Sequence, residues 1–151
     1  MKSSTHLVRN MLKEDQVDKV LRNHLRMKGW TETNDPRKIG QQDWDIRARH
    51  STKDRVLLIE CKGDGNSKYN TQKIHGAFWT SIGQVMARMD IQGNNPNKAR
   101  IYAIGIPKTW EGIFQRKARK MKYGWDFLKL RIFLVNSNKT VEEKTYRQFL
   151  R

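Results

Sequence analysis

A carboxylate and an amine stand two positions apart in an otherwise apolar segment, LLIECKGDG, at 57–65. A buried strand does not hold charged groups unless they are paired or used in chemistry. Alternate side chains of a strand share a face, so Glu60 and Lys62 point the same way, about 6–7 Å apart along the strand. Ile59 and Cys61 then face the opposite side. An acidic oxygen donor beside an ammonium group suits a metal-assisted reaction at phosphate.

A second carboxylate can be brought to the first by a hairpin. If the chain turns between Thr52 and Lys53, Asp45 comes directly opposite Glu60, with Cβ atoms about 4.5–5.5 Å apart. Two carboxylates this close repel each other unless a cation lies between them, and hard oxygen donors suit Mg²⁺. Thr-Lys is not a favoured pair for a two-residue turn, and a longer loop would shift this register. Asp43 faces the same side and competes with Asp45, which is preferred because it sits better opposite Glu60.

The surrounding pattern predicts helices and strands that would position these groups. Apolar spacing over 14–30 indicates a helix that ends near Gly29, and similar spacing over 70–89 indicates a second helix. A third, basic helix is expected over 109–122. Strands are expected at the following segments: a short one at the start of 31–42, then 43–49, in which Trp44, Ile46 and Ala48 share one face, 55–62, 99–107 as a central strand, and 128–136 as the last strand.

Composition indicates the partner more than the chemistry. The chain of 151 residues carries 31 Lys and Arg against 15 Asp and Glu, a formal net charge of +16, which favours a polyanion such as nucleic acid. The length predicts one domain over 1–151. We expect no membrane span, since no long apolar run occurs. A single cysteine fits the reducing cytoplasm, where we expect the protein to reside.

The residues Asp45-Ile46 followed by Ile59-Glu60-Cys61-Lys62-Gly63 resemble the D…ExK signature of the PD-(D/E)XK nuclease superfamily. The resemblance covers most of the chain and is closest to restriction-endonuclease-like and archaeal Holliday-junction-resolvase-like members. It implies an α/β fold: a mixed central sheet flanked by helices, with a core in α-β-β-β-α-β order. Trp44 stands where the signature has proline, a common variation in the superfamily.

The same resemblance implies a role for particular residues. Asp45, Glu60 and the backbone carbonyl of Cys61 would bind Mg²⁺, for which Mn²⁺ can substitute, and Lys62 would orient the attacking water. Gln84 is similar to a glutamine that many members carry on the helix after ExK. Resolvase-like members place a glutamate on the first helix, where Asp18 stands here and Glu14 lies one turn earlier, so both are catalytic candidates.

These observations predict a Mg²⁺-dependent DNA endonuclease that leaves a 5′-phosphate, as the resemblance implies. Whether it is a structure-selective junction resolvase or a restriction or repair nuclease stays open, and double-strand cutting would call for a homodimer. Residues expected to contact DNA are Lys62, Arg116, Lys117, Arg119 and Lys120, of which the last four could equally form a solvated helix face. The alternatives are a catalytically inactive nucleic-acid-binding module of the same fold and a basic RNA-binding protein, for which the chain lacks an aromatic RNP-like strand.

Overall fold

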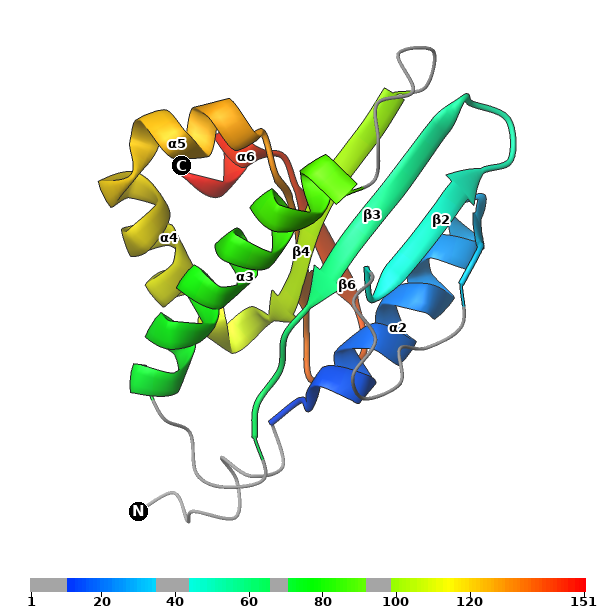
Figure 1. Ribbon diagram of the computed structural model, residues 1–151. Helices are drawn as coiled ribbons and strands as arrows, with labels where there is room; N and C mark the ends of the chain where they lie inside the picture. The colour runs from blue at the N-terminus through cyan, green and yellow to red at the C-terminus, as the bar shows by residue number, and fades with distance from the viewer. Residues whose placement is uncertain (1–10, 35–43, 66–70, 92–98) are drawn as a thin grey trace.

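The computed structural model describes residues 11–34, 44–65, 71–91 and 99–151. They form a mixed six-stranded sheet in the order β1-β2-β3-β4-β5-β6, in which β3, β4 and β5 are parallel and the remaining pairs are antiparallel (Figure 1). The strands are β1 (Trp30–Glu32), β2 (Ile46–His50), β3 (Arg55–Cys61), β4 (Ala99–Pro107), β5 (Arg131–Val135) and β6 (Val141–Lys144). The helices are α2 (Glu14–Met27), α3 (Thr71–Ile91), the 3-10 turn η1 (Lys108–Trp110), α4 (Glu111–Lys120), α5 (Lys122–Leu128) and α6 (Tyr146–Phe149).

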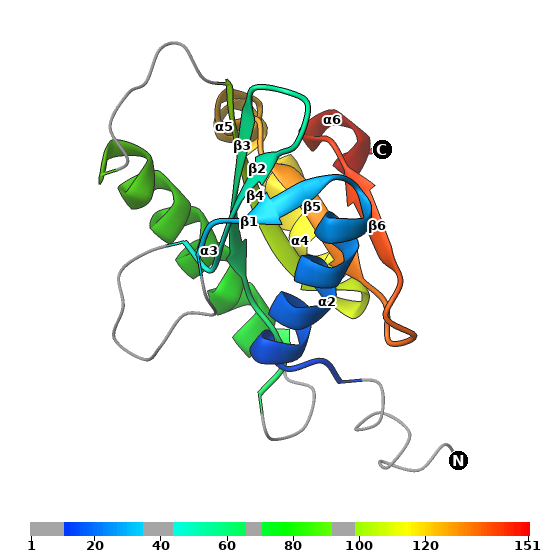
Figure 2. The same ribbon diagram turned by 90° about the vertical axis from the view of Figure 1, so that its right-hand side faces the viewer.

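Helices cover both faces of the sheet, which confirms the predicted fold class. Figure 2 shows α2 and α3 on opposite sides of the strands. The apolar side of α2 packs with Leu57, Ile59 and Cys61 of β3, whereas Leu58 packs with α3 and α4 on the other face. Burial of β3 and β4 between two helical layers explains why β4 reads as an almost unbroken apolar run. The described elements begin in the predicted α-β-β-β-α-β order.

The register of the β2–β3 hairpin agrees with the prediction. Ile46 pairs with Ile59 and Arg49 with Val56, which is the register that would bring Asp45 opposite Glu60 if the strand continued by one more residue. The loop is longer than the expected two-residue turn at Thr52 and Lys53. It gains the same number of residues before and after these two, so the register of the strands is unchanged. His50 stabilises it, because its Nδ1 accepts hydrogen bonds from the backbone N–H groups of Thr52 and Lys53, each at 3.2 Å.

One predicted alternation is wrong. Trp44 was expected to share a face with Ile46 and Ala48, but it packs in the cluster on the α3 side while those two residues pack against α2. The strand begins only at Ile46, and the chain bends at Asp45. Regular alternation therefore stops one residue before it would reach Trp44. Asp43, the competitor of Asp45, lies outside the described residues.

The C-terminal part contains more structure than its sequence suggested. Strand β5 is not the last strand, because β6 pairs with it as an antiparallel sheet edge. Its segment VEEK has a single apolar residue, and the turn before it uses Lys139 at φ 68° rather than the Gly or Asn that usually signals a hairpin. The short helix α5 was also missed. No helix in the described ranges is long and apolar enough to cross a membrane.

Candidate active site

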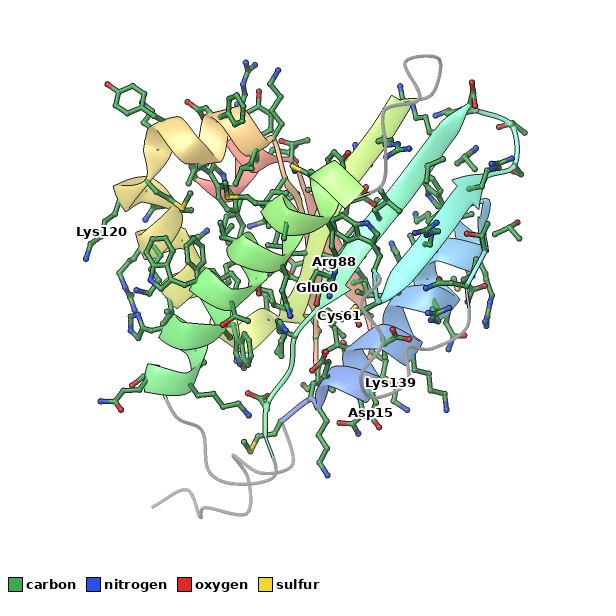
Figure 3. The ribbon with its side chains drawn as sticks, in the orientation of Figure 1. Asp15, Glu60, Cys61, Arg88, Lys120 and Lys139 are labelled. Carbon is green, nitrogen blue, oxygen red and sulfur yellow. The ribbon has the colours of Figure 1, made fainter. Side chains whose placement is uncertain are left out.

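Glu60 is a fully buried carboxylate near the C-terminal end of β3. It lies on the sheet face that α3 covers, and its Oε2 forms an ion pair with the guanidinium of Arg88 from that helix (Figure 3). Lys62 follows on the same face, with its Nζ 3.8 Å from Glu60 Oε1. The two residues thus point the same way, as the strand spacing predicts. A second cation, Arg88, was not expected there.

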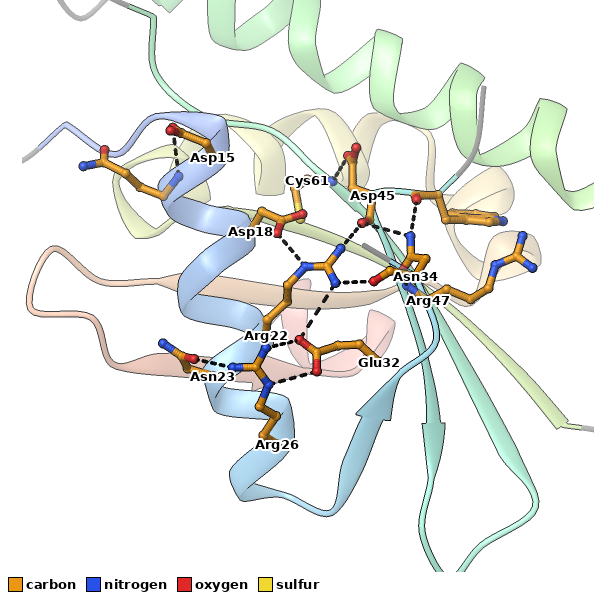
Figure 4. A network of polar contacts seen from close by, with 12 residues as sticks. Asp15, Asp18, Arg22, Asn23, Arg26, Glu32, Asn34, Asp45, Arg47 and Cys61 are labelled. Carbon is orange, nitrogen blue, oxygen red and sulfur yellow. Dashed lines mark hydrogen bonds and ion pairs between the residues drawn. The ribbon is translucent and has the colours of Figure 1, made fainter. Parts of the chain in front are cut away.

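Asp45 is held beside the same strand end by contacts at both its side chain and its backbone. Its Oδ2 accepts a hydrogen bond of 2.7 Å from the backbone N–H of Cys61 (Figure 4). Its carbonyl accepts hydrogen bonds from Arg22 at 2.6 Å and from the Asn34 side chain at 3.3 Å. Asp45 is only 4% exposed. These contacts fix the bend at Asp45, just before β2 begins. The Asp45 carboxylate accepts the Cys61 N–H, which would otherwise bond to a backbone carbonyl of the neighbouring strand.

The backbone of Cys61 faces Asp45. The N–H and C=O groups of successive strand residues point alternately to the two neighbouring strands. Lys62 donates its N–H to Gly105 of β4, and Cys61 donates its own toward β2, so the Cys61 carbonyl also lies on the Asp45 side. Burial raises the pKa of the Cys61 thiol well above its usual range, and the negative charge of Asp45 raises this pKa further. The thiol is therefore a neutral core group.

Arg22 of α2 connects the first helix to Asp45. Its Nε donates to Asp18 Oδ1 at 2.7 Å, and its other nitrogens donate to the carbonyls of Asn34 and Asp45, each at 2.6 Å. Glu32 Oε1 lies 3.8 Å away. Burial raises the pKa of Asp18, and this effect outweighs the opposing effect of Arg22. Asp18, which was predicted as a catalytic candidate, is therefore engaged in an ion pair with Arg22.

The segment after Lys62 joins β3 to the start of α2. A Cβ on Gly63 would lie 2.3 Å from the backbone nitrogen of Glu14, so only glycine allows this approach. The Asp64 carboxylate then accepts hydrogen bonds from Leu12 N at 2.9 Å and from Trp110 Nε1 at 2.8 Å. The Gly-Asp pair that follows the ExK residues is therefore structural, and it places Glu14 in the first turn of α2 near the end of β3.

Helix α3 brings two polar side chains to the site. Gln84 and Arg88 are four residues apart and so lie on one helix face. Within the described residues, the buried Oε1 of Gln84 has no hydrogen-bond partner. Arg88 reaches Glu60 directly. Gln84 lies one turn before Arg88 on the same helix, and its expected role stays a prediction, whereas Arg88 had no recognisable signal in the sequence.

The oxygen groups at this strand end fit a hard divalent cation. Glu60 supplies a carboxylate from β3 and Asp45 a second one from the residue just before β2, and the Cys61 carbonyl lies on the Asp45 side. Mg²⁺ is commonly bound by one or two carboxylates together with waters. No group of three or more His, Cys, Asp or Glu suitable for a metal occurs in the described ranges.

The basic residues of α4 lie elsewhere. In Figure 3 Lys120 is at the outer edge of the molecule, well separated from Glu60. Lys117 Nζ lies 5.4 Å from the ring centroid of Trp79, and Arg119 donates to the carbonyl of Leu150 at 3.1 and 3.2 Å. Arg116 and Lys120 are exposed. Of the residues expected to contact DNA, only Lys62 is at the site.

Comparison with solved structures finds the same fold in two cyanobacterial proteins. One is an XisH family protein from Nostoc punctiforme, with a TM-score of 0.55 and 18% sequence identity over 85% of this chain and 97% of that one. The other is an fdxN element excision controlling factor protein from Anabaena variabilis, with a TM-score of 0.57 and 17% identity over 87% of this chain and 98% of that one. No family model matches the sequence. Curated proteins give no match either. At these identities the likeness concerns the fold.

Proposed function

We propose that this protein is a DNA endonuclease that depends on a divalent cation, Mg²⁺ or Mn²⁺. The observation that carries the proposal is the grouping at the end of β3, where Asp45 accepts a hydrogen bond from the Cys61 backbone and Lys62 lies on the same face as the buried Glu60. Two carboxylates and an amine are the groups that a metal-assisted phosphodiester hydrolase needs. The net charge of +16 supports a nucleic-acid substrate.

In this proposal each group has a separate task. Asp45, Glu60 and the Cys61 carbonyl would hold the cation, which would supply positive charge against the scissile phosphate when bound. Lys62 orients the water that attacks phosphorus, and the bond from phosphorus to the 3′ oxygen breaks, which leaves a 5′-phosphate. The Cys61 amide and Arg22 keep Asp45 in place through its carboxylate and its carbonyl.

The substrate class follows from charge and from one structural neighbour. Excision is a reaction of DNA, so a neighbour named as an excision controlling factor for the fdxN element supports DNA over RNA. Exposed Arg116 and Lys120, together with Lys117, would contact the phosphate backbone at a distance from the cleavage site. Their replacement by Ala should flatten the dependence of DNA affinity on salt, since fewer counterions would be released on binding.

A second candidate function is a DNA-binding module of the same fold without activity. The ion pair between Arg88 and Glu60 favours it, because a carboxylate already paired with an arginine need not bind a metal.

One experiment separates the two functions. Linear, flapped and four-way DNA should be cleaved with Mg²⁺ and not with EDTA, and Glu60→Gln should abolish cleavage. Asp126→Asn, an exposed site on α5, controls for loss of one negative charge. If the protein binds all three DNA substrates but cleaves none of them in Mg²⁺ or in Mn²⁺, it is the inactive DNA-binding module instead.

A further inference from the structure

Arg88 occupies one of the two proposed metal-binding carboxylates. Its guanidinium pairs with Glu60 Oε2, and the Glu60 side chain is completely buried while that of Arg88 is 10% exposed. A buried carboxylate without a counter-charge is strongly unfavourable, so Glu60 requires a cation in every state of the protein. When a divalent ion is present, that ion and Arg88 compete for Glu60.

Charge makes the two occupants mutually exclusive. Arg88 neutralises one carboxylate, whereas a divalent ion between Asp45 and Glu60 would neutralise both. A guanidinium and a metal ion that share one carboxylate oxygen repel each other strongly at close range in a site of low dielectric constant. Lys62 adds a further positive charge at 3.8 Å from Glu60 Oε1. Three cations around one carboxylate are not compatible, and the long side chain of Arg88 is the one that can leave.

The contacts of Arg88 are suited to such an exchange. Within the described residues its hydrogen bonds and ion pairs involve Glu60 alone, so release of that carboxylate frees the guanidinium. Part of the side chain already reaches the surface, toward which it can turn. Gln84, one turn earlier on the same face of α3, has a buried side-chain oxygen without a partner in the described part of the chain.

We propose that Arg88 is a built-in counter-cation of Glu60 that a divalent metal must displace, and that it therefore lowers the metal affinity of the site. This inference rests on the proposed metal-binding function. It makes Arg88 a regulator of metal occupancy rather than a catalytic residue. With Arg88 on Glu60 the carboxylate is stable without metal, and occupancy then responds to the concentration of free divalent ion.

Calorimetric titration with Mn²⁺ tests the proposal. We expect Arg88→Gln, which removes the charge and keeps a hydrogen-bond donor, to bind Mn²⁺ about tenfold more tightly or better. Glu60→Gln should lose binding. Arg131→Gln is the matched control, since Arg131 forms an ion pair with Glu143 on the β5–β6 pair and should leave the affinity unchanged.

The outcomes separate this inference from the proposed function. Equal or weaker binding by Arg88→Gln, with binding still lost in Glu60→Gln, overturns the role of Arg88 and leaves the metal site intact. If the unaltered protein and Arg88→Gln both fail to bind Mn²⁺, the proposed function fails and the inference with it. Tighter Mn²⁺ binding by Arg88→Gln than by the unaltered protein, with binding lost in Glu60→Gln, supports both the metal site and the role of Arg88.

A measurement on the unaltered protein keeps the test decisive if Arg88→Gln does not fold. The NMR signal of the Arg88 Nε–H group, assigned by its disappearance in Arg88→Lys, should shift as Mg²⁺ is added and exchange faster with water once Glu60 is released. A signal that stays unchanged while Mg²⁺ saturates the protein would show that the ion pair persists, and the proposal would then be wrong.

Discussion

Two buried arginines flank the proposed carboxylate pair, and they are held in different ways. Arg22 of α2 is bonded to a carboxylate and to two backbone carbonyls, with a further carboxylate nearby (Figure 4). Arg88 of α3 is paired with the carboxylate of Glu60. The planar guanidinium can donate in several directions, and the protein uses this fully at Arg22.

The difference separates a structural arginine from an exchangeable one. Release of Arg22 would leave several buried oxygens without a donor, so it fixes the bend at Asp45 in all states. Release of Arg88 exposes one carboxylate that another cation can satisfy. Arg22 thus positions Asp45, whereas Arg88 pairs with Glu60 and, in our proposal, competes with the metal for it.

The largest expected effect concerns catalysis and asks whether Arg88 belongs to the chemistry at all. Lys62→Ala should lower the rate of single-turnover DNA cleavage by about a thousandfold at saturating Mg²⁺, because Lys62 is the group proposed to orient the attacking water. Arg88→Gln should stay within about tenfold of the unaltered rate under the same conditions. An Arg88 variant as impaired as Lys62→Ala would make Arg88 a catalytic residue.

The next effect concerns the stability that Arg22 provides. Arg22→Met should lower the free energy of unfolding by about 3–5 kcal/mol, because it removes the cation paired with the partly buried Asp18 and a donor to the carbonyls of Asn34 and Asp45. Urea denaturation in EDTA measures this change. Added Mg²⁺ should not restore this stability, since the oxygens that accept hydrogen bonds from Arg22 are not those proposed to bind the metal.

Arg88→Gln should have a smaller effect on stability that depends on metal. In EDTA the variant should lose about 1–3 kcal/mol of unfolding free energy, since the buried Glu60 exchanges a charged donor for a neutral one. Saturating Mg²⁺ should return most of this loss, because a ligand bound by the folded state stabilises it. A loss that metal leaves untouched would place Arg88 in the same structural class as Arg22.

The smallest effect concerns Asp18, the carboxylate that holds Arg22. Burial raises its pKa above the usual 3.8, so the folded state favours the protonated form. The stability this provides is present below pH 3.8 and is lost as pH rises through the folded-state pKa. Asp18→Asn should therefore be more stable relative to the unaltered protein at pH 7 than at pH 3, in thermal unfolding at both pH values.

The same variant separates structure from chemistry for Asp18. Asparagine keeps an oxygen that can accept from Arg22, so cleavage by Asp18→Asn should change little. A loss of activity comparable to that of Lys62→Ala, in a protein of normal stability, would restore Asp18 as a catalytic residue.

Local patterns in the sequence were enough to predict most of the fold. Apolar spacing located α2, α3 and α4, and alternation located the β2–β3 hairpin with its register. The exceptions include Trp44, β6 and the short helices α5 and α6. Each depends on surroundings rather than on pattern: a bend held by Asn34 and Arg22, a sheet edge with little apolar content, and two short helices, one of which begins directly after α4.

By itself the sequence determined which groups share the end of β3. The alternation of side chains and the length of the hairpin bring Asp45, Glu60 and Lys62 to one place, because these are short-range properties of two adjacent strands. Only the tertiary structure decided which cations face the two carboxylates. Arg22 and Arg88 come from helices on opposite faces of the sheet, 23 and 28 positions from their acceptors Asp45 and Glu60. Such contacts depend on how helices dock against the sheet, and no local pattern encodes that docking.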